Sequence, residues 1–136
     1  MIQIFCGERG AGKTKRLIEM ANSKSRDAKG NLIFIDDDST NARLVNRKVR
    51  FVSTDEFEIR GCTAFYGFLS GIISNDYDIE TIYIDGLLSV VDCSLENTKD
   101  LFFKLSNLCK KNGVKMFINI NSEKSEDIPH FIQQYA

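Results

Sequence analysis

The sequence predicts an α/β fold of three layers, in which a mostly parallel sheet of about five strands lies between two layers of helices. One observation and one rule of chain topology support this prediction. Short apolar runs rich in β-branched residues alternate along the 136 residues with segments of helical periodicity. Strands that alternate with helices pair in parallel through right-handed crossovers, which place helices on both faces of the sheet. Ligand-binding groups are then expected at the carboxyl ends of the strands.

The composition indicates one folded domain across residues 1–136. No flexible linker interrupts the chain, and 43% hydrophobic with 27% charged residues is typical of a globular protein. The formal net charge is −1 and the basic residues are dispersed, so no nucleic-acid-binding face is expected. Residues 1–5 lack the basic segment of a secretory signal, and the apolar stretch at 65–73 is too short to span a bilayer. We therefore expect a cytoplasmic protein.

The four cysteines, Cys6, Cys62, Cys93 and Cys109, are far apart in the sequence and form no CxxC pair. Neither a disulfide framework nor a zinc site is therefore expected in a reducing compartment. We expect reduced thiols, most of them buried.

The first half of the chain contains three expected strands. Residues 2–6 form a β-rich run that enters a glycine-rich turn, and the segment 17–21 continues with apolar residues at helical spacing. Residues 32–35 (LIFI) are apolar throughout, which is typical of a strand buried on both faces. Residues 49–53 predict another strand. The order begins as strand, loop, helix, strand, strand.

The middle of the chain continues the alternation. Residues 62–73 are apolar and predict a buried helix, although two glycines weaken the pattern. Residues 81–85 (TIYID) predict a strand that stops at Gly86. A long helix is expected between Ser94 as its N-cap and Gly113 as its C-terminal stop.

The last expected strand covers residues 114–120, and a polar loop at 121–127 follows it. Pro129 is expected to begin a short terminal helix. Asn119 and Asn121, at the end of the strand, are candidates for sensing a γ-phosphate, although an ordinary strand terminus is the favoured interpretation. The single histidine, His130, is assigned no role.

Residues 7–14 (GERGAGKT) match the phosphate-binding pattern G-x-x-x-x-G-K-[ST] at every fixed position. Glycines let successive backbone N–H groups point at phosphate oxygens, and the helix that follows adds the positive end of its dipole. Lys13 supplies a charge for the β- and γ-phosphates, and the Thr14 hydroxyl is a ligand for Mg²⁺. The expected nucleotide-binding residues are Gly7, Glu8, Arg9, Gly10, Ala11, Gly12, Lys13 and Thr14. The expected ligands are ATP and Mg²⁺, since no N-K-x-D motif for guanine follows any predicted strand.

Asp85 ends the apolar run at 82–84, as expected of a buried strand that delivers one carboxylate toward the metal beside the loop. Asp85-Gly86 is also a common turn dipeptide, so a structural role alone is the alternative. Together with the loop, the pattern favours Asp85 as a metal ligand and, with Lys13, as a catalytic residue.

Further candidates lie at other strand ends. Asp36, Asp37 and Asp38 follow a strand, and either one of them orients water or binds substrate, or all three form a solvated turn. Four arginines are candidates for an arginine finger, in cis or from a neighbouring subunit: Arg43, Arg47, Arg50 and Arg60.

The motifs GERGAGKT, LIFIDDD, RFVSTDEF and TIYIDG resemble those of small, stand-alone bacterial P-loop ATP-binding proteins, some of which are labelled as related to the twitching-motility retraction ATPase. The order of elements is also similar to RecA-like ATPases and to thymidine kinases. The resemblance implies a three-layer P-loop NTPase fold of the RecA-like type. Those families usually place a glutamate directly after the acidic-strand aspartate. This chain has Gly86 there, so the resemblance implies slow hydrolysis.

Three functions remain open at the level of the sequence. The first is a slow Mg²⁺-dependent ATPase or ATP-dependent switch. The second is a phosphotransferase for a small acceptor, with one of Asp36 to Asp38, or Asp55 or Glu56, as the base. The third is a nucleotide-binding module without turnover, whose site is completed by a second copy or a protein partner.

Overall fold

A computed structural model describes residues 1–122 and 128–136. The strands are β1 (Ile2–Gly7), β2 (Asn31–Asp36), β3 (Val49–Ser53), β4 (Ile79–Ile84) and β5 (Lys115–Asn121). They form a single sheet in the order β1-β5-β4-β2-β3, in which every pairing is parallel. The predicted α/β fold with about five mostly parallel strands is confirmed. The polar loop expected at 121–127 lies outside the described residues from 123 onward.

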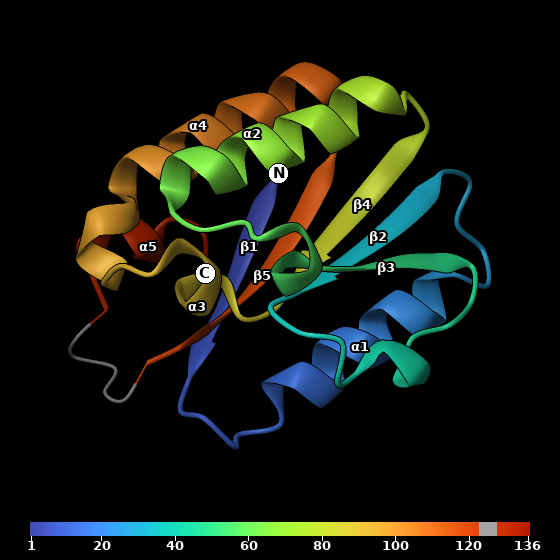
Figure 1. The fold of residues 1–136 in the computed structure, drawn as a ribbon, viewed down its shortest axis with the longest axis horizontal. Helices are drawn as coiled ribbons and strands as arrows, with labels where there is room; N and C mark the ends of the chain where they lie inside the picture. The colour runs from blue at the N-terminus through green and yellow to red at the C-terminus, as the bar shows by residue number, and fades with distance from the viewer. Residues whose placement is uncertain (123–127) are drawn as a thin grey trace.

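The helices lie on both faces of this sheet (Figure 1). They are α1 (Lys13–Lys24), α2 (Cys62–Asn75), α3 (Leu87–Val91), α4 (Lys99–Asn112) and α5 (His130–Gln133). The described residues also include three short 3₁₀ segments in the connections between elements: η1 (Ala42–Leu44), η2 (Thr54–Phe57) and η3 (Leu95–Thr98). Helices α2 and α4 cover one face, while α1 and η1 lie against the other. Within the described residues, none of the helices combines the length and the apolar character needed to cross a membrane.

Strand β2 is buried on both faces, as its apolar sequence predicts. Leu32 and Phe34 pack into the core beneath α1, where they join Leu17. Ile33 and Ile35 point to the opposite face and join the larger core formed with α2 and α4. The period of two along the strand therefore divides its side chains between two cores.

A row of aromatic rings crosses the α1 face of the sheet, with one ring from each strand. Phe51 stacks on Phe34, with ring centroids 5.8 Å apart, and Phe34 stacks on Tyr83 at 6.3 Å. Tyr83 stacks on Phe117 at 5.7 Å, and Phe117 on Phe5 at 6.2 Å. Stacked rings add about 0.5–1.5 kcal/mol per pair beyond their buried area. The row therefore links neighbouring strands to one another across the α1 face of the sheet.

Several element boundaries differ from the prediction. The long helix does not begin at Ser94, because residues Leu95–Thr98 first form the 3₁₀ turn η3, and α4 starts at Lys99. It ends at Gly113 in the left-handed conformation, as predicted. Helix α2 is present but is buried along one side only, so that its two glycines, Gly67 and Gly71, are exposed. The short helix α3 was not predicted.

The expectation of mostly buried thiols was wrong. Only Cys109 is buried, and Cys6, Cys62 and Cys93 are half-buried, all four as free cysteines. Cys62 and Cys93, which are 31 residues apart in sequence, lie with their Sγ atoms 3.7 Å apart. Sequence spacing gives no sign of this pair, because it arises from the packing of α2 against the end of α3.

Candidate functional site

The glycine-rich loop at residues 7–14 connects β1 to α1 at the carboxyl edge of the sheet. Gly10 and Gly12 adopt positive φ angles of 89° and 83°, which glycine tolerates best, and a Cβ at either would meet nothing within 4 Å. The backbone conformation, rather than crowding, therefore requires these glycines. Gly12 caps α1, so the first N–H groups of a twelve-residue helix face the loop.

Lys13 is the buried cation of the loop, with 9% of its side chain exposed. Its Nζ donates hydrogen bonds to the carbonyl oxygens of Gly7 at 2.9 Å and Glu8 at 2.7 Å. The ammonium is thus held by neutral acceptors at the centre of the loop. Phosphate oxygens are stronger acceptors for an ammonium than carbonyls, so an anion there can replace these two bonds.

Thr14 and Asp85 meet although they are 71 residues apart in sequence. The Thr14 hydroxyl donates a hydrogen bond of 2.6 Å to Asp85 Oδ2, and the Gly86 N–H donates to Asp85 Oδ1 at 3.0 Å. The Asp85 N–H donates to the carbonyl of Ile35 at 2.8 Å, which ties the end of β4 to β2. A hydroxyl and a carboxylate oxygen are the hard oxygen ligands that Mg²⁺ prefers, so this pair fits the ion. The structure thus brings together the two residues predicted to bind metal.

Gly86 and Asp37 are packed against one another beside this pair. Gly86 has a φ of 71°, and a Cβ at this position would lie 2.8 Å from both Cγ and Oδ1 of Asp37. A larger residue therefore cannot follow Asp85 without displacing Asp37. A glutamate at this position, as the resembling families carry it, would need both the left-handed backbone conformation and a displacement of the Asp37 side chain.

The three aspartates after β2 have different environments. Asp36 is 4% exposed, with Oδ1 accepting from the Asp37 N–H at 2.7 Å and Oδ2 from Asn41 Nδ2 at 3.4 Å. Burial raises the pKa of Asp36 to about 7, and the neighbouring Asp37 and the charge of Asp85 add to the rise. Asp38 is exposed and accepts from the Thr40 N–H at 3.0 Å. Asp38 thus forms a solvated turn, whereas Asp36 and Asp37 face the Asp85 region.

Asn119 lies on β5, between the loop strand β1 and the Asp85 strand β4. It is 4% exposed, and neither Oδ1 nor Nδ2 has a hydrogen-bond partner within the described part of the chain. An unpaired buried amide costs about 1–3 kcal/mol, so a ligand or water that pairs with it gains that amount. Asn121, the other candidate at this end of the strand, is exposed and lines the two cavities beside the loop.

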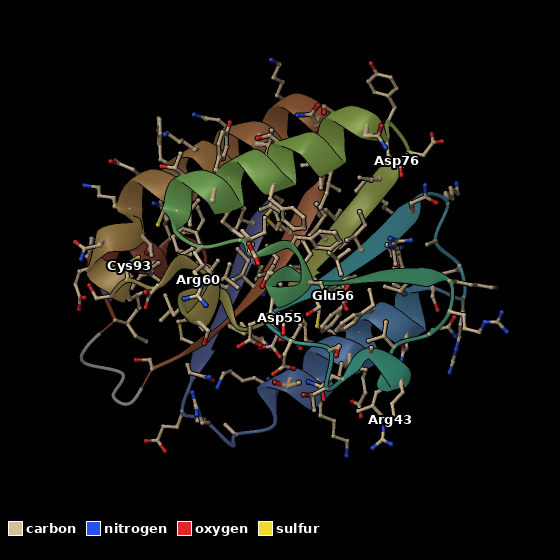
Figure 2. All side chains as sticks on the ribbon, in the orientation of Figure 1. Arg43, Asp55, Glu56, Arg60, Asp76 and Cys93 are labelled. Atoms are coloured by element: carbon tan, nitrogen blue, oxygen red, sulfur yellow. The ribbon has the colours of Figure 1, made fainter. Side chains whose placement is uncertain are left out.

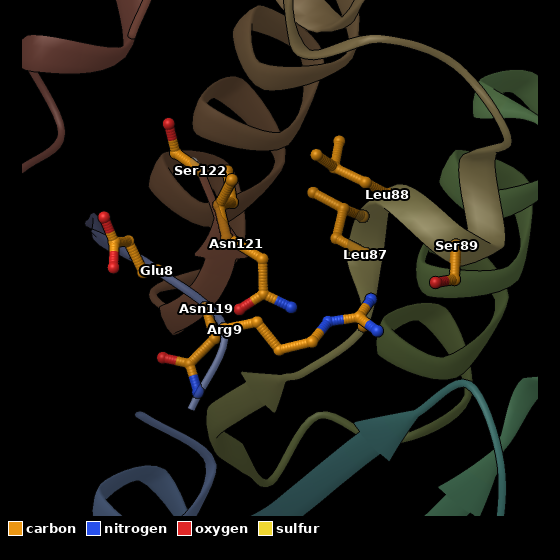
Figure 3. Close-up of a pocket in the computed structure, with 10 residues that line it drawn as sticks. Glu8, Arg9, Leu87, Leu88, Ser89, Asn119, Asn121 and Ser122 are labelled. Atoms are coloured by element: carbon orange, nitrogen blue, oxygen red, sulfur yellow. The ribbon is translucent and has the colours of Figure 1, made fainter. Parts of the chain in front are cut away.

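Asn119 lines a cavity of about 760 Å³ beside the loop (Figure 3). Arg9 extends from the loop toward α3 in this view, and Asn121 lines the same cavity. Leu87 and Leu88 form an apolar wall opposite the polar groups. The cavity therefore offers both hydrogen-bonding and apolar surface next to the phosphate loop.

No protein-family model matches this chain, and no curated protein matches it significantly.

The remaining sequence candidates lie around the site rather than in it. Arg43 and Arg47 line a separate cavity of about 510 Å³ with Asn22, and Arg43 points away from the sheet in Figure 2. Arg50 is exposed on the edge strand β3. Arg60 lines a small cavity of about 300 Å³ together with Asp37, the aspartate that packs against Gly86.

The acidic residues of η2, Asp55 and Glu56, are exposed. Asp55 lines the same small cavity as Arg60 and accepts a hydrogen bond from the Ser53 hydroxyl, and Glu56 is exposed (Figure 2). Neither lines the cavities of about 760 and 670 Å³ that contain loop residues. His130 is exposed at the start of α5. Among the acidic candidates, Asp36 interacts electrostatically with Asp85, and Asp37 packs against Gly86.

Proposed function

We propose that this chain binds ATP with Mg²⁺ on residues 7–14 and acts as a slow ATPase or ATP-dependent switch with a RecA-like P-loop core. The observation that carries the proposal is the 2.6 Å hydrogen bond between Thr14 and Asp85. Two independent sequence patterns predicted these residues, and their hydroxyl and carboxylate groups lie where one Mg²⁺ would bind both. The same site would hold the ion next to Lys13 and the N-terminus of α1.

Each residue has a distinct part in this proposal. The backbone N–H groups of the loop and the Lys13 ammonium bind the phosphate oxygens and stabilise charge that builds up during phosphoryl transfer. Thr14 and Asp85 hold the ion, which when bound neutralises charge on the β- and γ-phosphates. Asn119 lies on β5, between the loop strand β1 and the Asp85 strand β4, and supplies an unpaired amide. The amide lines the adjoining cavity and can bond a group that enters it.

We propose slow turnover because of the residue that follows Asp85. Fast hydrolysis needs a carboxylate or amide that orients the attacking water. Gly86 supplies none at the position where the resembling families place a glutamate. We place the protein in the cytoplasm, where ATP is abundant and free thiols persist.

The first experiment is a thermal-shift titration with a nucleotide panel and Mg²⁺, followed by product analysis. We expect ATP with Mg²⁺ to raise the unfolding temperature of wild type, since a ligand bound only to the folded state stabilises it. Lys13→Ala should lose that shift, measured against the unfolding temperature of the same variant without nucleotide. A single-turnover assay should then detect ADP above the Lys13→Ala background. An unchanged unfolding temperature with every nucleotide would reject the proposal.

The cavity of about 760 Å³ favours a second candidate function, a phosphotransferase with a small acceptor. It is large enough for a small molecule and adjoins the loop through Glu8 and Arg9. Asn119 and Arg9 would orient the acceptor. The test is whether any nucleoside or metabolite pool accelerates ATP consumption by wild type. If no pool does so, the switch or slow-ATPase function is the one to retain.

A further inference from the structure

A second cavity, of about 670 Å³, opens from the phosphate loop toward η1. Lys13 and Thr14 form one end, so this space is continuous with the phosphate-binding site. The other end is lined by Ile18 and Glu19 of α1 and by Asn41 and Leu44 of the η1 turn. Its volume lies within the range of small-molecule sites.

The far end of this cavity has an apolar surface. Leu44 is 54% exposed, which makes it one of the few large hydrophobic side chains left open to solvent in the described residues. Ile18, which is 6% exposed, lines the same space. A single exposed leucine is ordinary on a protein surface, but here it stands next to a charged phosphate cradle. A ligand that is anionic at one end and flat and apolar at the other matches this arrangement.

Hydrogen bonds hold the Leu44 turn in place. Asn22 of α1 donates from Nδ2 to the Leu44 carbonyl at 2.9 Å, and its Oδ1 accepts from the Asn46 N–H at 2.7 Å. Asn41 donates to Asp36 Oδ2 at 3.4 Å. The turn is therefore fixed to α1 and to the end of β2 before any ligand binds, which lowers the entropic cost of binding there.

We infer that this cavity is the nucleoside subsite of the chain. The base and ribose of a nucleoside triphosphate pack against Leu44 and Ile18 while its phosphates occupy the loop. Asn41 and Glu19 are among the polar groups that line this cavity, and they can hydrogen-bond the base or the ribose hydroxyls, Asn41 as donor and acceptor and Glu19 as acceptor. This inference rests on the proposed binding of ATP to residues 7–14.

The test compares ATP with inorganic tripolyphosphate, which carries the phosphate chain without a nucleoside. Both are titrated calorimetrically with Mg²⁺ into wild type and into the Lys13→Ala, Leu44→Ala and Phe103→Ala variants. Phe103 is the matched control, since it is also large, apolar and exposed, at 65%, but lies on α4 across the sheet. Neither Leu44 nor Phe103 contributes a buried side chain, so both variants should fold.

We expect wild type to bind ATP about tenfold or more tightly than tripolyphosphate. Leu44→Ala should lower the affinity for ATP by roughly fivefold to tenfold, because it removes apolar contact area. The ratio of the ATP affinity to the tripolyphosphate affinity should therefore become smaller. Phe103→Ala should leave this ratio of affinities unchanged, and Lys13→Ala should lower the affinity for both ATP and tripolyphosphate.

Equal affinities for ATP and tripolyphosphate, both dependent on Lys13, would overturn the nucleoside subsite and leave the phosphate site intact. A preference for ATP that Leu44→Ala does not change would place the nucleoside elsewhere and also overturn the inference. If neither ligand binds, the proposed function fails, and the subsite fails with it.

Discussion

At the scale of single residues, Asp36 makes stability depend on pH. Burial raises its pKa from 3.8 to about 7, so the folded state holds the proton more tightly than the unfolded chain. This stabilising contribution is complete below about pH 4 and is lost as the pH rises through about 7. Its size is on the order of a few kcal/mol. We therefore expect the free energy of unfolding to fall over this range.

Urea unfolding at a series of pH values, in EDTA and without nucleotide, measures this effect. Asp36→Asn keeps an acceptor for the Asp37 N–H. Its free energy of unfolding should fall much less between pH 4 and 7 than that of wild type. Asp38→Asn, at an exposed aspartate of the same turn, should follow wild type. Parallel curves for wild type and Asp36→Asn would show that Asp36 titrates normally.

Gly86 gives a second prediction at this scale. Introducing the glutamate that the resembling families carry at this position should not produce fast hydrolysis. Gly86→Glu must adopt a φ of 71° and displace Asp37, so we expect lower stability and no gain in single-turnover rate. Gly86→Ala introduces the same Cβ without a carboxylate and should lose stability similarly. Gly113→Ala is the control for φ alone, because it has a φ of 67° and nothing within 4 Å of the Cβ.

The comparison is made by urea unfolding. Gly113→Ala should cost about 1 kcal/mol for the left-handed backbone, and Gly86→Ala should cost at least about 1 kcal/mol more. If the two alanine variants lose equal stability, the Asp37 side chain moves aside at little cost. Its contact with a Cβ at position 86 then does not explain the absence of glutamate there.

At the scale of elements, Cys62 at the start of α2 and Cys93 beyond α3 are positioned to form a disulfide. A low-molecular-weight disulfide would oxidise the pair by thiol exchange, giving one protein disulfide and two small thiols. Burial and the neighbouring Cys93 thiol raise the pKa of Cys62 to about 11, so little of it is thiolate at neutral pH. We expect the reaction to be slow at pH 7 and faster toward pH 9.

Thiol titration and intact mass measure this reaction. Wild type should lose two of its four free thiols and the mass of two hydrogens. Cys62→Ser should abolish the product, and Cys6→Ser, in β1, should retain it. A disulfide that forms equally well in Cys62→Ser would contradict the pairing of α2 with α3.

The sequence predicts the elements better than it predicts their lateral arrangement. The alternation of apolar runs and helical periodicity predicts β1 to β5 in order, and the loop pattern with Asp85 predicts the residues that meet at 2.6 Å. The position of β5 between β1 and β4 is not encoded in any local pattern. That position buries Asn119 and aligns the aromatic row, so neither was predicted. The contact of Asp37 with Gly86 was missed for the same reason, since it depends on β2 lying beside β4.

At the scale of the whole molecule, the C-terminal segment packs against the edge of the sheet and contributes to its core. The Ile4 N–H of β1 donates to the Tyr135 carbonyl at 2.8 Å, and Ile132 of α5 is fully buried in the core beneath α2 and α4. The Tyr135 ring packs on Phe102 of α4 with centroids 5.9 Å apart. The outer edge of the strand that carries the phosphate loop is therefore joined to the end of the chain, as expected for one cooperative domain.

Cooperativity of this kind predicts the effect of truncating Ile132. Ile132→Ala should lower the free energy of unfolding by about 2–4 kcal/mol, the usual cost of a cavity at a buried isoleucine. Gln133→Ala, its exposed neighbour, should change it by less than about 0.5 kcal/mol. Urea unfolding followed by far-ultraviolet circular dichroism and by tyrosine fluorescence should give coincident transitions in both variants. If Ile132→Ala separates the two signals, α5 unfolds independently of the sheet, and the phosphate loop and the C-terminal segment do not form one cooperative unit.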